Sequence, residues 1–130
     1  MKKDIQIQKV SQIFIAICPN EDDLWDVFIL NGQNYDLQNV LIATRGYGER
    51  DGQQVNTSTL RHFFERVPAQ SAVKIEPIAT ELFDLAHEYW ISFQHDGFMF
   101  DKKYVFVAGS INKDYFRTLP ILDIEGVMIG

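Results

Sequence analysis

The chain has 130 residues, enough for one domain with a full hydrophobic core, and its 46% hydrophobic and 23% charged residues are typical of a soluble globular protein. The net charge is −6, and basic residues cluster only at Lys2-Lys3 and Lys102-Lys103, so we expect no nucleic acid as a partner. The first residues lack the apolar segment of a signal peptide, and no apolar run is long enough to span a bilayer, so we expect a cytoplasmic location without membrane contact.

The N-terminal part of the chain predicts two strands. Ile5, Ile7 and Val10 alternate with polar residues, which is typical of a strand with one solvent-facing side. Residues 13–18 are apolar at every position, which indicates a strand buried on both faces. The single cysteine, Cys18, ends this run, and we interpret it as a small buried apolar residue.

The middle of the chain continues with runs rich in β-branched and aromatic residues. Strands are predicted over residues 25–30, 40–44, 59–67 and 73–75. Proline cannot donate a hydrogen bond to a strand ladder, so Pro68 and Pro77 are expected to lie just beyond the ends of the last two strands. Residues 45–54 are the longest polar, glycine-rich stretch and predict a protruding hairpin tip or a mobile loop.

Residues 80–86 form the one predicted helix. Thr80 suits the N-cap position, and Leu82, Leu85 and Ala86 share one face at helical spacing. A helix of about two turns depends on tertiary packing for its stability. The remaining strands are predicted over residues 89–93, 98–100, 104–108 and 121–129, with a turn at 112–114 and Gly126 as a candidate β-bulge.

Three dipeptides, Asn31-Gly32, Asp51-Gly52 and Asp96-Gly97, are signals for two-residue hairpin turns, because a type I′ turn requires a positive φ at both central positions. Short strands spaced by turn signals, with no repeat and no linker, predict one β-sandwich domain over residues 1–130. The expected fold class is mainly all-β: an antiparallel, two-sheet, immunoglobulin-like sandwich with one short helix. A closed barrel is the alternative.

No catalytic constellation stands out in the sequence. The three histidines, His62, His87 and His95, fall in a strand, after the helix and at a hairpin turn, and this spacing does not predict a metal site. A nucleophilic pair of Cys18 with His62 is an alternative that the sequence leaves open. We expect no catalytic residue, no metal and no cofactor, and therefore a protein that is not an enzyme.

Binding residues are expected in two places, the polar stretch at 45–54 and the strands around 89–100. The candidates are Arg45, Tyr47, Glu49, Arg50, Trp90 and Phe98. Tyr47 lies in the polar stretch and is the best candidate for an exposed aromatic ring. A concave pocket lined by Trp25, Trp90 or Tyr104 would favour a binder of small ligands or carbohydrates.

Residues 46–50, Gly-Tyr-Gly-Glu-Arg, resemble the start of a G-x-G-x-x-G phosphate loop and the core of motif 3 in class II aminoacyl-tRNA synthetases. The phosphate loop requires a third glycine, and motif 3 continues into an apolar helix. Here the polar residues Asp51-Gly52-Gln53-Gln54 follow instead. We interpret the segment as a glycine-rich turn.

Segments spread over nearly the whole chain carry a further resemblance. They are Val40-Leu41-Ile42, Gly46-Tyr47, Ser58-Thr59-Leu60-Arg61-His62, Val67-Pro68-Ala69-Gln70-Ser71, Lys74-Ile75-Glu76, Phe100-Asp101-Lys102-Lys103-Tyr104-Val105-Phe106, Leu119-Pro120 and Gly126-Val127. Together they resemble a family of short uncharacterised bacterial proteins that often carry the label phenylalanyl-tRNA synthetase subunit alpha. The resemblance implies an accessory role beside a full-length synthetase, with that enzyme or tRNA as partner. The chain is too short for the catalytic domain of a synthetase, so no catalytic residue is carried over.

The leading functional hypothesis is a non-enzymatic sandwich that binds another protein or a second copy of itself. Every open sheet has edges that can pair with another chain, and a homodimer is the simplest such assembly. A binder of small ligands or carbohydrates is the first alternative, and the synthetase-related accessory role is the second.

Overall fold

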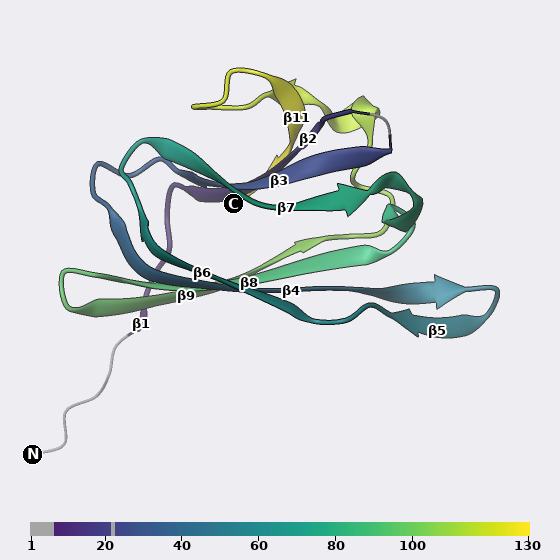
Figure 1. The fold of residues 1–130 in the computed structure, drawn as a ribbon, viewed down its shortest axis with the longest axis horizontal. Helices are drawn as coiled ribbons and strands as arrows, with labels where there is room; N and C mark the ends of the chain where they lie inside the picture. Colours follow the sequence, from purple (N-terminus) through teal and green to yellow (C-terminus); the bar gives the residue numbers. More distant parts are fainter. Residues whose placement is uncertain (1–6, 22) are drawn as a thin grey trace, which may run out of the picture.

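The computed structural model describes residues 7–21 and 23–130, which form two stacked β-sheets (Figure 1). The strands are β1 (Ile7–Gln8), β2 (Ile13–Pro19), β3 (Leu24–Asn31), β4 (Leu37–Arg50), β5 (Gln53–Asn56), β6 (Leu60–Val67), β7 (Ser71–Ala79), β8 (Ala86–His95), β9 (Phe98–Phe106), β10 (Arg117–Thr118) and β11 (Glu125–Ile129). Two single turns of 3₁₀-helix are also present, η1 (Thr80–Leu82) and η2 (Lys113–Tyr115).

All neighbouring strands in the two sheets are antiparallel except β1 and β9. The first sheet has the order β1-β9-β8-β4-β5, with β6 also paired to β4, and the second has the order β10-β11-β2-β3-β7. The short pair of β1 with β9 is parallel. The mainly all-β, two-sheet antiparallel sandwich predicted from the sequence is confirmed, whereas its immunoglobulin-like detail stays a prediction. Ile5, part of the first predicted strand, lies outside the described residues.

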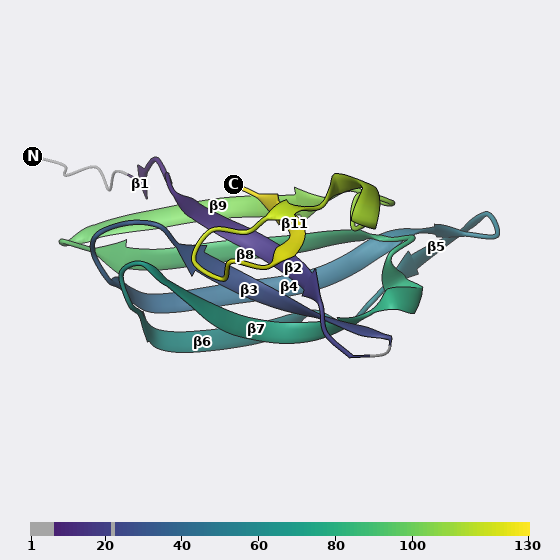
Figure 2. The same ribbon diagram turned by 90° about the horizontal axis from the view of Figure 1, so that it is seen from above.

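The main core lies between the sheets, because a strand places alternate residues on opposite faces. In β3, Trp25, Val27 and Ile29 face the other sheet and are buried. The opposite face of the second sheet is covered too, since Cys18 packs with Leu119 in a smaller cluster. The C-terminal segment that supplies this cover is yellow in Figures 1 and 2. The prediction that Cys18 is buried is confirmed, and this burial raises the pKa of its thiol.

A buried hydrogen bond joins the two sheets. The hydroxyl of Tyr104 in β9 donates to the carbonyl oxygen of Ile13 in β2 at a distance of 2.6 Å. Burial raises the pKa of Tyr104 far above its ordinary value, so the phenol keeps its proton and remains a donor.

Two of the three predicted hairpin turns are confirmed. Asp51-Gly52 connects β4 to β5, and Asp96-Gly97 connects β8 to β9, with φ values between 50° and 77° at all four positions. The prediction for Asn31-Gly32 is wrong, because this dipeptide leaves β3 for β4 in the other sheet and has no positive φ. Gly32 is required for close approach, since a Cβ there would lie 2.9 Å from the carbonyl oxygen of Gln12.

The predicted helix at residues 80–86 is the largest error in the sequence interpretation. Only the single 3₁₀ turn η1 forms, and Thr80 does not cap it with its side chain. Ala86 and His87 instead begin β8, where they pair with β4. Two helical turns carry little stability of their own, so the pairing of β8 between two other strands decides this conformation.

Three predicted strand boundaries are also corrected. β7 continues through Pro77 to Ala79, which is tolerated because β7 is an edge strand that pairs only with β3. Residues 98–106 form one continuous strand, β9, where two were predicted. The last strand begins only at Glu125. Gly126 is buried where a Cβ would lie 2.5 Å from the carbonyl oxygen of Ile17, so close approach of β11 to β2 explains this glycine.

Candidate functional site

Three large apolar side chains that solvent reaches lie next to one another on the outer face of the first sheet, and Met99 in β9, 39% exposed, lies farther along the same face. Leu41 in β4, Phe63 in β6 and Trp90 in β8 are 52%, 58% and 47% exposed. Leu41 pairs directly with Phe63, and Ala43 pairs directly with Trp90, so the four side chains are cross-strand or diagonal neighbours. We call Leu41, Ala43, Phe63 and Trp90 the outer patch.

Charged side chains border the outer patch on the same face. The register of the sheet and the alternation of β6 place them next to it: Arg45, Arg61, Glu65, Glu88, Asp101 and Lys103. The indole N–H of Trp90 donates to the carboxylate of Asp101, and the ammonium of Lys103 lies 5.6 Å from the centre of the Trp90 ring. These contacts hold the ring of Trp90 on the surface of the sheet, where it remains half exposed.

Arg45 and Tyr47, both predicted binding residues, extend this face toward the end of β4. The Nε of Arg45 donates to Oε2 of Glu88 at 3.2 Å, and its guanidinium carbon lies 5.1 Å from the centre of the Tyr47 ring. The Tyr47 hydroxyl approaches Oε1 of Glu88 to 3.5 Å, a distance at which a hydrogen bond is weak. Tyr47 is half-buried, so it is less exposed than the sequence suggests.

Glu49 and Arg50 lie near the tip of the β4–β5 hairpin, which extends beyond the rest of the sandwich (Figure 1). The polar stretch is therefore the protruding hairpin that the sequence offered as one interpretation. Glu49 is exposed. The guanidinium of Arg50 forms two 2.6 Å bonds to the carboxylate of Asp84 and a third bond, at 2.8 Å, to the carbonyl oxygen of Glu81. Arg50 therefore fixes the hairpin against the segment around η1 and lowers the pKa of Asp84.

Phe98 does not belong to the outer patch. It opposes His95 at the β8–β9 turn, whereas Trp90 opposes Lys103 five residues farther along β9, about 17 Å away at 3.4 Å per residue. Strand alternation also places Phe98 and Trp90 on opposite faces of the sheet. The structure therefore groups Arg45, Tyr47 and Trp90 on one face and leaves Phe98 apart from them.

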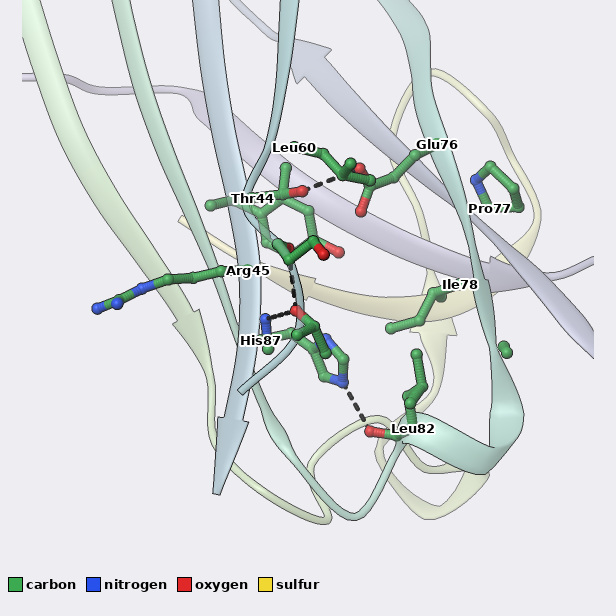
Figure 3. Close-up of a pocket in the computed structure, with 13 residues that line it drawn as sticks. Thr44, Arg45, Leu60, Glu76, Pro77, Ile78, Leu82 and His87 are labelled. Carbon is green, nitrogen blue, oxygen red and sulfur yellow. Dashed lines mark hydrogen bonds between the residues drawn. The ribbon is translucent and has the colours of Figure 1, made fainter. Parts of the chain in front are cut away.

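A cavity of about 210 Å³ opens between the two sheets near the base of the β4–β5 hairpin. Figure 3 shows that residues of β4, β7, β8 and η1 line it, and that the side chain of Arg45 points away from it. Leu60, Ile78 and Leu82 supply apolar walls, while Glu76 and His87 supply polar groups. Sequence reasoning missed this site, because Glu76 and His87 belong to strands in different sheets.

The polar groups of this cavity form two separate sets of hydrogen bonds, one centred on Glu76 and one on His87. Oε1 of Glu76 accepts from the Thr44 hydroxyl at 3.0 Å and from Nε2 of His62 at 2.7 Å. Nε2 of His87 donates to the carbonyl oxygen of Leu82 at 2.7 Å, because a carbonyl only accepts. A hydroxyl and an imidazole both bound to one carboxylate do not form the hydroxyl–imidazole–carboxylate relay of a nucleophilic triad.

The other arrangements weighed from the sequence are not brought together. Cys18 faces the cluster on the outer side of the second sheet, whereas His62 contacts Glu76 at the cavity. His95 stacks on the ring of Tyr35 with 3.5 Å between ring centres. Among residues 7–21 and 23–130, no group of three or more His, Cys, Asp or Glu is placed to bind a metal ion, and no helix is long and apolar enough to cross a membrane.

The aromatic pocket that would favour a carbohydrate binder is not formed from the residues named for it. Trp25 is buried between Phe83 and Phe116, and Tyr104 is buried in the core, whereas Trp90 lies on the open outer face. Leu41 and Phe63 of the outer patch were missed as well. The sequence does contain a signal for Phe63, because alternation in β6 places this residue on the polar face, opposite to His62 and Phe64.

No family model, curated protein or solved structure matches this chain. The resemblance to the short proteins labelled as a synthetase subunit therefore stays a prediction.

Proposed function

We propose that this protein is a self-associating interaction module, in which the outer patch of one copy binds the outer patch of a second copy. The observation that carries the proposal is the contiguous group of three large apolar side chains, each about half exposed, on one sheet face. Single exposed apolar residues are ordinary, whereas a contiguous group bordered by charges is typical of an interaction surface.

Charge supports a second copy as the occupant. The chain as a whole carries a net charge of −6, so two copies repel each other over most approaches. The residues that border the outer patch are three cations (Arg45, Arg61 and Lys103) and three anions (Glu65, Glu88 and Asp101). The formal charges around the outer patch therefore cancel, so two acidic molecules that approach through this face do not meet net negative charge there.

The geometry of the face also suits a symmetric contact. Two sheets pack face to face at about 10 Å when their side chains interdigitate. In a two-fold dimer the same surface is used twice, so each Trp90 meets the partner's patch, and a half-exposed tryptophan is a typical hot-spot residue.

The proposal is tested by sedimentation velocity over a range of protein concentrations. We expect the native chain to form a dimer, and the double variant Leu41→Ser/Phe63→Ser to raise the dimer dissociation constant by at least about tenfold. Both side chains are more than half exposed, so the substitutions leave the core intact. Tyr115→Ser is the matched control, since Tyr115 is 64% exposed but lies outside the first sheet.

A native chain that remains monomeric at the highest concentrations would refute the self-association proposal. The same holds for a dimer that the double variant leaves unchanged. If a different protein binds at this face and no dimer forms, the outer patch is still an interaction surface, but its partner is not a second copy of the chain.

A further inference from the structure

The cavity between the sheets retains hydrogen-bonding groups that the fold leaves without partners. Oε1 of Glu76 accepts two hydrogen bonds, but no hydrogen bond to its other carboxylate oxygen is found in the described part of the chain. His87 is only 6% exposed, and its Nε2–H is used by the carbonyl oxygen of Leu82. The lone pair of Nδ1 is then the free acceptor of this buried imidazole, and Nδ1 lies on the side of Gly46.

Tyr89 adds a third group to the same cavity. Its side chain is 1% exposed, and its hydroxyl has no hydrogen-bond partner within residues 7–21 and 23–130. Burial, and then the negative charge of Glu76, raise the pKa of Tyr89, so the phenol stays protonated near the carboxylate. These three polar groups open onto the cavity rather than into enclosed protein, so a molecule that enters it can form hydrogen bonds with them.

We propose that this cavity is a binding site for a small primary ammonium compound. The carboxylate of Glu76 supplies the negative charge, and its free oxygen and Nδ1 of His87 are acceptors for ammonium N–H groups. Leu60, Ile78 and Leu82 form the apolar wall for a short hydrocarbon chain.

The size and charge of the cavity narrow the ligand class. Its volume of about 210 Å³ is below the range of roughly 300–1,000 Å³ typical of pockets for drug-sized molecules, so the ligand is small. An anion is disfavoured because Glu76 faces the same space and the cationic head of Arg45 points outward (Figure 3). A neutral alcohol fits the acceptors but brings no positive charge to Glu76, whose contact with His62 is an ion pair only when that imidazole is protonated.

The test is an NMR titration of the ¹⁵N-labelled native chain with n-butylammonium chloride. Butan-1-ol and sodium butyrate are the matched probes, since they have similar shapes but different charges, and sodium chloride controls for ionic strength. We expect saturable shifts of the backbone amides of Gly46, Thr57 and Leu82 with butylammonium, an apparent dissociation constant at least about tenfold weaker for butanol, and no site-specific shift with butyrate.

A variant of Glu76 tests whether the negative charge of its carboxylate is needed for binding. Glu76→Gln keeps one oxygen as an acceptor for Thr44 and His62, and we expect it to weaken butylammonium binding by at least about tenfold. Glu125→Gln is the control, because Glu125 is exposed on β11 and does not line the cavity.

Three results would overturn the proposal: no saturable shift with butylammonium, equal affinity for butylammonium and butanol, or a folded Glu76→Gln variant that binds as well as the native chain. The comparison of probes uses the native protein alone, so it decides the question even where the variant does not fold. None of these results depends on whether the chain forms a dimer.

Discussion

At the scale of single residues, Asn31 connects the two sheets through one buried side chain. Its Nδ2 lies 2.9 Å, 3.2 Å and 3.0 Å from the carbonyl oxygens of Tyr35, Val67 and Pro68, and its Oδ1 accepts from the backbone N–H of Gln33 at 3.0 Å. The side chain is fully buried, so water does not compete for these groups. In the sequence, Asn31 is typical of a hairpin turn. In the structure, its side chain instead supplies the hydrogen bonds at the point where the chain passes from β3 in one sheet to β4 in the other.

Replacing Asn31 with alanine is expected to lower the free energy of unfolding by about 3 kcal/mol. The change leaves buried carbonyl oxygens and one N–H without a partner, and each such group costs roughly 1–3 kcal/mol. Chemical denaturation measures the loss. Asn34→Ala is the matched control, because Asn34 is exposed, and we expect a change within about 0.5 kcal/mol there. Equal effects of the two substitutions would show that the buried amide has no special role.

At the scale of the elements, the β4–β5 hairpin is a separate extension of the first sheet. β5 pairs only with β4, and its residues are exposed or half-buried. The pair of Arg50 with Asp84 is the contact that holds the hairpin to the segment around η1. Because Arg50 lowers the pKa of Asp84, this contact is complete above the ordinary pKa of an aspartate and is lost as the pH falls through the lowered value.

The variant Arg50→Ala is therefore expected to loosen the hairpin without unfolding the sandwich. Amide hydrogen exchange should become faster at the paired residues Gly48 and Val55, while Ile91 in the centre of β8 keeps its protection. Arg61→Ala on neighbouring β6 serves as the control, and we expect it to leave exchange in the hairpin unchanged. Unaltered protection of Val55 in Arg50→Ala would show that strand pairing alone holds the hairpin.

At the scale of the whole molecule, the sheets are joined by pairings between strands far apart in the sequence. β2 pairs with β11, β3 pairs with β7, and the hydroxyl of Tyr104 connects β9 to β2. Neither sheet buries its inner face without the other, because one core cluster contains side chains from both. The two sheets are therefore expected to unfold together.

This cooperativity is tested with the Trp90→Phe variant, in which Trp25 is the remaining tryptophan. Trp25 belongs to the second sheet and contacts Phe83 and Phe116, so its fluorescence reports on the core, while far-ultraviolet circular dichroism reports on both sheets. We expect the two signals to give the same denaturation midpoint at concentrations low enough to avoid association. Two separate midpoints would indicate that the sheets are independent units.

The amino-acid sequence by itself determined the features that depend on local chemistry. The alternation of Trp25, Val27 and Ile29 specifies a strand with a buried face. Asp51-Gly52 and Asp96-Gly97 adopt the positive φ values that two-residue hairpin turns require. These signals act between neighbours in the chain, so the β-sandwich class follows from them.

Only the tertiary structure decided the features that depend on partners distant in the sequence. Residues 80–86 have a helical pattern but too few turns to be stable, so the pairing of β8 with β4 and β9 overrides it. Glu76 and His87 reach one cavity, and Phe63 and Trp90 reach one face, because the order of the strands places them together. Propensity and alternation are short-range, whereas the candidate sites are products of long-range pairing.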